Sequence, residues 1–136
     1  MKIRHAVCAV MLAAAVATPA AAQVEAQPVP EEAGPALRGE EWYRGQLVDL
    51  SEILGGSHYL RVLCEGRGDQ RWRDYMRGVI NREPTYNALL VEGFNRGYRN
   101  EEGRFPACDA GARQMEAELR ARGLRVAQAL SARHTN

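Results

Sequence analysis

The stretch SEILGGSHYLRVLC, residues 51–64, decides the fold class, because its apolar residues recur at helical spacing and it ends in a cysteine. With the residues just before it, it places the following set on one helix face: Leu47, Leu50, Ile53, Leu54, Ser57, Leu60 and Cys64. Gly55 and Gly56 interrupt this helix, and each glycine costs about 1 kcal/mol relative to alanine. That cost predicts either a kink or a close approach by another helix.

Three further amphipathic patterns follow, and no segment alternates with the two-residue period of a strand. We expect helices at about residues 40–64, 70–82, 86–101 and 110–133. Asp69, Thr85 and Asp109 are placed to cap the last three helices, and Pro84 is placed to end the second. Short connections join the patterns, with a turn at 65–68 and a loop at 103–107. The sequence therefore predicts an all-α fold, a small bundle of about four helices.

The first 22 residues have the features of a secretory signal peptide. Lys2 and Arg4 form a positive n-region, residues 6–17 an apolar run, and the alanines at 20–22 a cleavage site. A membrane anchor, the alternative, needs about 20 apolar residues. Cys8 lacks the small-residue context of a lipidated cysteine. Export predicts a periplasmic location.

The chain after the signal divides into a linker and one domain. Residues 23–39 are rich in Pro, Ala and Glu, a composition typical of a disordered segment. Residues 40–136 then form the helical domain. No segment after the signal is apolar enough to cross a membrane, so we expect no transmembrane segment after cleavage.

The charge balance argues against nucleic acid as a partner. Removing Lys2 and Arg4 from the 18 basic residues leaves 16 against 17 acidic residues, a formal net charge of −1. Proteins that bind nucleic acid usually carry a clearly basic domain.

Cys64 and Cys108 are the two cysteines that remain once Cys8 is removed with the signal. An exported chain with an even number of cysteines is typically disulfide-bonded. A free thiol, a metal pair and a redox-active couple are the alternatives, but no further metal ligand lies nearby and the spacing is not C-x-x-C. We therefore predict one structural disulfide between them.

The stretch GFNRGYR, residues 93–99, combines small, aromatic and basic residues within one helix. Gly93, Phe94, Gly97 and Tyr98 lie on the apolar stripe, so we expect them to pack against another helix, with Gly55 and Gly56 as the facing pair. Arg96 and Arg99 lie off that stripe. They either pair with neighbouring glutamates or bind a carboxylate or phosphate of a partner.

A second basic and aromatic stretch covers residues 67–83, where Arg71 and Trp72 are candidates for partner binding. Such a face would suit an envelope protein or an anionic envelope component. The alternative is that Trp72 belongs to the core and the arginines form a solvated face.

Residues with catalytic potential are few. His58 has no second ligand at three- or four-residue spacing, so a packed or hydrogen-bonded histidine is the simpler interpretation, and no metal is predicted. The available carboxylate pairs, such as Asp49 with Glu52, are typical of solvated helix surfaces. No catalytic residue and no cofactor are predicted. The favoured function is binding in the cell envelope. One alternative is an enzyme or enzyme subunit acting on envelope polymers, and another is a purely structural or inhibitory protein with no defined ligand pocket.

Three motifs and a cysteine together carry a resemblance to a known family: residues 51–64, Trp72–Met76, Phe94–Arg99 and Cys108. Over about residues 40–133 the chain resembles an uncharacterised group of small exported alphaproteobacterial proteins, a domain of unknown function with two well-separated cysteines. The resemblance implies an alphaproteobacterial periplasm and a bond between Cys64 and Cys108. It implies no activity and no catalytic residue.

Overall fold

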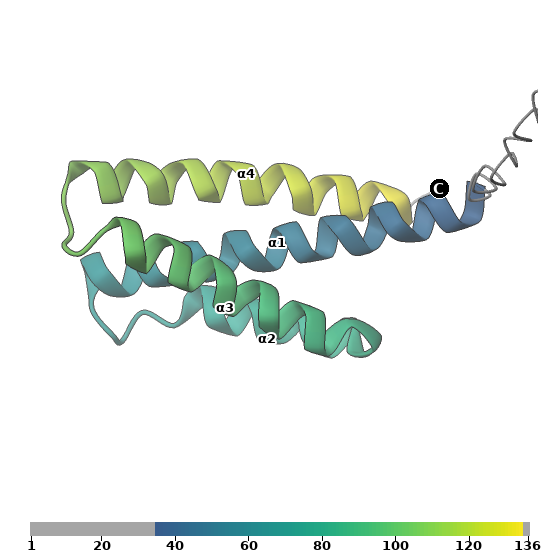
Figure 1. Cartoon of the computed structure of the whole chain (residues 1–136), viewed down its shortest axis with the longest axis horizontal. Helices are drawn as coiled ribbons and strands as arrows, with labels where there is room; N and C mark the ends of the chain where they lie inside the picture. The colour runs from purple at the N-terminus through teal and green to yellow at the C-terminus, as the bar shows by residue number, and fades with distance from the viewer. Residues whose placement is uncertain (1–34, 135–136) are drawn as a thin grey trace, which may run out of the picture. The chain divides into compact units, whose positions relative to one another are not determined.

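The structure, a computed structural model, describes residues 35–134, which form four α-helices (Figure 1). These are α1 (Pro35–Glu65), α2 (Arg71–Arg82), α3 (Asn87–Arg104) and α4 (Ala110–His134), with a 3₁₀ turn, η1 (Pro84–Tyr86), before α3. No strand occurs within this range, and the predicted all-α class is confirmed. The predicted signal peptide and the linker up to residue 34 lie outside the described residues.

Helix α1 is the centre of the fold and contacts α2, α3 and α4. Figure 1 shows α4 running beside α1, with α2 and α3 packed on α1 away from α4. From Ser51 to Leu60 every residue is buried except Glu52, which is half-buried. A helix that is covered on several sides buries residues around most of its circumference, rather than along one stripe.

Helices α1 and α3 are in backbone contact through glycines. A Cβ atom added to Gly55 would lie 1.9 Å from the carbonyl oxygen of Phe94, and one added to Gly97 would lie 1.9 Å from that of Glu52. A Cβ atom on Gly93 would lie 2.1 Å from the Ser51 hydroxyl oxygen. At Gly55 and Gly97 the close atoms belong to the backbone, so no side chain fits there without movement of α1 or α3. Close approach by α3 therefore accounts for the glycines in the middle of α1.

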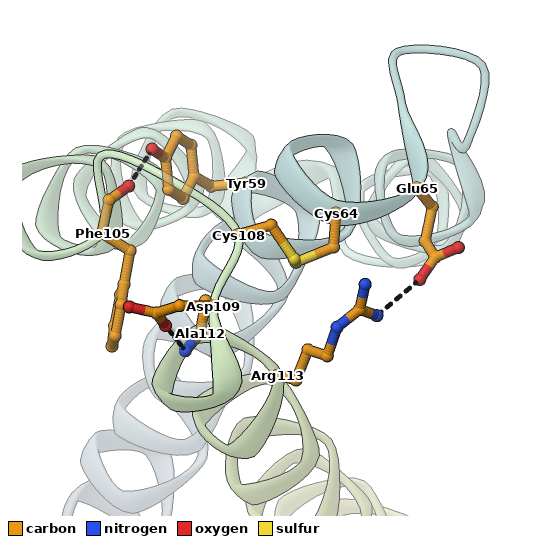
Figure 2. Close-up of a disulfide and its surroundings, with 8 residues drawn as sticks. All are labelled: Tyr59, Cys64, Glu65, Phe105, Cys108, Asp109, Ala112 and Arg113. Carbon is orange, nitrogen blue, oxygen red and sulfur yellow. Dashed lines mark hydrogen bonds and ion pairs between the residues drawn. A yellow bond between two sulfur atoms is a disulfide. The ribbon is translucent and has the colours of Figure 1, made fainter.

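A disulfide between Cys64 and Cys108 joins the end of α1 to the segment before α4, as Figure 2 shows. The two Cα atoms are 5.1 Å apart, and the predicted pairing is confirmed. The Tyr59 hydroxyl donates a hydrogen bond of 2.5 Å to the carbonyl oxygen of Phe105, which holds the same segment against α1.

Asp109 begins α4 as predicted. Its Oδ1 accepts a hydrogen bond of 2.7 Å from the backbone N–H of Ala112 (Figure 2). The first N–H groups of a helix have no acceptor within the helix, so this bond satisfies one of them. Arg113 and Glu65 form an ion pair of 3.3 Å across the same end of the bundle.

Several predicted helix boundaries differ from the structure. Helix α1 begins at Pro35 rather than at about residue 40, so the last residues of the predicted linker are helical. Proline suits a first helical turn, where a backbone N–H has no acceptor to lose. Helix α3 continues to Arg104, so the predicted loop at 103–107 is confined to the residues after Arg104.

Two predicted caps were wrong. Thr85 lies within η1, and Tyr86 is the residue at the α3 N-cap, without a side-chain capping bond. Gln70 rather than Asp69 occupies the α2 N-cap position. Asp69 nevertheless accepts a hydrogen bond of 3.3 Å from the backbone N–H of Arg71. Both differences arise where proline or glycine-rich turns shift the start of a helix.

Candidate functional site

A cleft of about 540 Å³ opens where α2 and α3 meet on α1. We refer to it as the His58 cleft. Its wall combines one residue of α1 with residues of α2 and α3: His58, Arg73, Met76, Arg77, Ile80, Val91, Phe94, Asn95 and Tyr98. Basic and polar groups therefore share the cleft with apolar and aromatic side chains, and no carboxylate lines it.

His58 is the most buried polar residue of this cleft, with 7% of its surface exposed. Its ring packs 5.7 Å from that of Phe94 and 6.1 Å from that of Tyr98, measured between centroids. Its Nδ1 atom is buried and has no hydrogen-bond partner. The packed histidine expected from the sequence is thus present, but it also forms part of a cavity wall.

Burial lowers the pKa of His58 below its ordinary value of 6.5. The charge of Arg73 lowers it further, while the carboxylates of Asp69 and Asp74 act in the opposite direction. Because a buried imidazolium would be poorly solvated, the neutral ring is the stable form in the folded protein.

The two arginines of the cleft differ in their pairing. Arg77 is 2.9 Å from Asp74 in an exposed ion pair. Arg73 is exposed and makes no ion pair with any residue in the described part of the chain. Arg73 is therefore a cation at the cleft whose charge no neighbouring carboxylate neutralises.

The two predicted candidates on and near α2 lie away from this cleft. Arg71 pairs with Asp69 at 3.1 Å, and Asp69 also pairs with Arg61 at 2.8 Å. The hydrogen bond from Arg61 lowers the pKa of Asp69, as expected for a carboxylate that is stabilised in its charged form. Trp72 is half-buried against the core, as the structural interpretation of this residue expected.

The two predicted candidates on α3 also stay apart from the cleft. Arg96 binds Glu52 of α1 at 2.5 Å and Glu92 of its own helix at 3.4 Å, so it follows the ion-pairing alternative. Arg99 is exposed and has no ion pair within residues 39–133. The four predicted partner-binding residues do not converge on one site.

The sequence does hold a signal for the α2 residues of the cleft. Arg73, Met76, Arg77 and Ile80 are separated by three, one and three positions, so they form one face of a helix. Arg71 is on another face, and Trp72, four positions before Met76, is at the edge of this one and does not line the cleft. Selecting residues by periodicity, rather than by the adjacency of a basic and an aromatic residue, identifies the α2 side of the cleft.

A second cavity, an apolar groove of about 490 Å³, lies on the other side of α2, between α1 and α4. Trp72 and Tyr75 of α2 face Ala121, Leu124 and Ala127 of α4 across it. The indole Nε1 atom of Trp72 is buried without a hydrogen-bond partner. Arg120 is the charged residue in its lining. Helix α2 is thus flanked by a polar cleft and an apolar groove.

In the part of the chain that the structure describes, no group of three or more His, Cys, Asp and Glu side chains is placed to hold a metal ion. Within the same part, none of the helices combines the length and apolarity needed to cross a membrane. A cation beside an apolar pocket can bind an anion with an apolar body.

The chain matches one described protein family. The model of the family DUF2385, described as a protein of unknown function, matches residues 42–134. The match covers α2, α3 and nearly all of α4, together with most of α1. No curated protein and no solved structure matches the chain.

Proposed function

The chain belongs to the family DUF2385, and from that premise we propose that it is an exported protein of the periplasm that acts by binding. The N-terminal sequence supports export, because Lys2, Arg4 and the apolar run that follows have the pattern of a signal peptide. A disulfide between Cys64 and Cys108 suits an oxidising compartment. An alphaproteobacterial cell envelope is the setting that the sequence resemblance implies.

The observation that carries a binding role is the composition of the His58 cleft. A cavity of about 540 Å³ has the size of a small-molecule site, typically about 300–1,000 Å³. It presents an arginine without a described ion-pair partner beside apolar and aromatic side chains, including Met76 and Phe94. An anionic component of the envelope, free or part of a partner protein, is the class of ligand that this cleft suits.

The alternative, an enzyme acting on envelope polymers, has less support at this site. General acid–base catalysis needs two groups of suitable pKa that converge on the substrate. His58 lines the cleft, but none of the residues that line it with His58 is a carboxylate. No described observation favours hydrolysis over binding.

Export is tested by the N-terminus and the cysteines of protein recovered from the periplasmic fraction. We expect mass spectrometry to find a chain that begins near Gln23 and carries Cys64 joined to Cys108. A chain that keeps Met1, or one recovered in the cytoplasmic fraction with free thiols, would contradict the proposed location.

Binding is tested by native mass spectrometry of the same material, purified without detergent. We expect a noncovalent adduct that is lost in Arg73→Gln and retained in Arg125→Gln. Arg125 is the matched control because it is exposed on α4, outside the lining of both cavities. Absence of an adduct, or an adduct that survives Arg73→Gln, would refute binding at this cleft.

A further inference from the structure

The charges around the His58 cleft indicate what kind of anion it accepts. Arg77 is paired with Asp74, so its charge is largely compensated within α2. Asp69, the other carboxylate near His58, is held by two arginines outside the cleft lining, Arg61 and Arg71. The surplus at the cleft is therefore the single positive charge of Arg73. One unneutralised cation complements a monoanion better than a dianion.

The shape of the Arg73 guanidinium further restricts which anionic group the ligand carries. Arginine presents two parallel N–H donors that match the two oxygens of a carboxylate. His58, buried and without a partner at Nδ1, lies in the same wall. A neutral imidazole in the wall adds no charge to the cleft, which again suits a ligand with one negative charge.

Four of the other lining residues, Met76, Ile80, Val91 and Phe94, are apolar and suit a ligand with an apolar body. Met76 is buried, Ile80 and Phe94 are half-buried, and Val91 is 44% exposed at the cleft. Methionine adapts its shape to the surface that it contacts, whereas the ring of Phe94 is held against His58. A small hydrophilic anion such as acetate would leave this apolar surface in water.

We propose that the His58 cleft binds a monocarboxylate with an apolar body, its carboxylate on Arg73 and its body against Met76, Ile80, Val91 and Phe94. This assignment rests on the proposed binding function and specifies its ligand class. The same chemistry has two sources, an aliphatic chain and an aromatic ring. Both fit a wall that contains aliphatic and aromatic side chains.

The test uses the mature, disulfide-bonded protein and the NMR signal of the His58 imidazole. The indole signal of Trp42, an exposed residue near the start of α1, is a built-in reference. At about 1.5 Å per residue, α1 from Trp42 to His58 spans about 24 Å. A ligand in the cleft should move the His58 signal and leave the Trp42 signal in place.

The five probe ligands differ in whether they carry a charge, in how many charges they carry and in whether they have an apolar body. Octanoate and phenylpropanoate represent the two sources, octanol lacks the charge, octyl phosphate adds a second charge, and acetate lacks the body. We expect octanoate or phenylpropanoate to bind more tightly than the other three, and the stronger of the two identifies the source. Equal binding of octanol would refute the role of the carboxylate. Tighter binding of octyl phosphate would refute the preference for a monoanion.

Variants locate the site and separate this inference from the proposed function. Arg73→Gln should weaken octanoate binding by about tenfold or more, while Arg125→Gln leaves it unchanged. Val91→Glu, which adds a carboxylate at an exposed position of the wall, should weaken it as well. An Arg73-dependent adduct from cells, without binding of either carboxylate, would overturn the ligand class and leave the binding function standing. If neither an Arg73-dependent adduct nor binding of either carboxylate were found, both the ligand class and the binding function would be overturned.

Discussion

On the side of α1 that faces α3, backbone lies against backbone, whereas the shorter helix α2 contacts α1 through bulky side chains and has a cavity on each side. Gly55 and Gly97 bring α1 and α3 together so closely that neither position has room for a Cβ atom. Helix α2 instead buries Met76 and Val79, and the His58 cleft and the apolar groove flank it. The tight contact fixes the fold, and the looser one leaves space for a ligand.

The difference arises from residue size at the contact. Glycine lets two helix backbones approach closely, and the cavity beside Gly97 measures only about 90 Å³. Large side chains keep helix axes farther apart and cannot fill all of the space beside a short helix. The candidate binding residues therefore lie where α2 and α3 meet, and Phe94 and Tyr98 of the most distinctive sequence motif are among them.

The largest expected loss of stability comes from opening the disulfide, which joins the end of α1 to the segment before α4. In the Cys64→Ser, Cys108→Ser variant we expect the free energy of unfolding in urea to fall by about 4 kcal/mol. The bond closes a long loop, so the unfolded chain gains the entropy of that loop when it is absent. A loss below about 1 kcal/mol would mean that packing alone holds the end of α1 to α4.

The next largest effect on stability is expected from a glycine of α3, which we compare with a glycine of α2. Gly97→Ala should destabilise the protein by about 1–3 kcal/mol, because its Cβ atom overlaps the Glu52 carbonyl of α1. Gly78→Ala in α2 should stabilise it by about 0.5–1 kcal/mol, because only Arg82 comes near and alanine favours the helix. Urea unfolding of both variants measures the contrast. If both substitutions changed the free energy of unfolding equally and in the same direction, the proposed difference between the tight α3 contact and the looser α2 contact would be wrong.

The pH dependence of stability tests whether His58 of α1 is buried as a neutral ring where α2 and α3 meet. Its folded pKa lies below 6.5, so the unfolded chain binds a proton that the folded protein does not. The free energy of unfolding should therefore fall as the pH decreases from about 6.5 towards the folded pKa. Thermal melts of the wild type and of His58→Phe measure this. A slope in this interval that persists in His58→Phe would assign the effect to other groups.

The smallest expected effect concerns the ion pair that spans α1 and α3. Arg96→Ala removes the bonds to Glu52 and Glu92 and should slightly lower the melting temperature, less so at high salt. Arg99→Ala, on the same helix and without a described ion pair, should leave it unchanged. Neither variant should alter binding at the His58 cleft. Lost binding in Arg96→Ala would extend the site to Arg96, which lies outside the lining of the cleft.

The sequence predicted the helices because each carries a local signal. Spacing of Leu47, Leu50 and Leu54 marked α1, and the Asp109 cap of α4 could be read from one residue in its context. Boundaries near Pro35 and Thr85 were wrong, because helix ends depend on small energy differences among neighbouring residues.

The candidate site was harder to predict, because its residues come from three helices. Arg71 and Trp72 stood out as neighbours in the chain, yet in the structure Arg71 pairs with Asp69 and Trp72 lies at the apolar groove. Whether an arginine is neutralised depends on residues that folding brings near it. Arg96 meets Glu52 only because α3 lies against α1.

By itself, the sequence determined the helical class, the glycines required for a close contact, and the single pairing open to Cys64 and Cys108. These follow from local periodicity, residue size and the number of cysteines. Only the tertiary structure decided that Arg96 is paired while Arg73 is not, and that His58 and Arg73 line one cleft. Ion pairing and cavity shape depend on distances between helices, which no short stretch of sequence specifies.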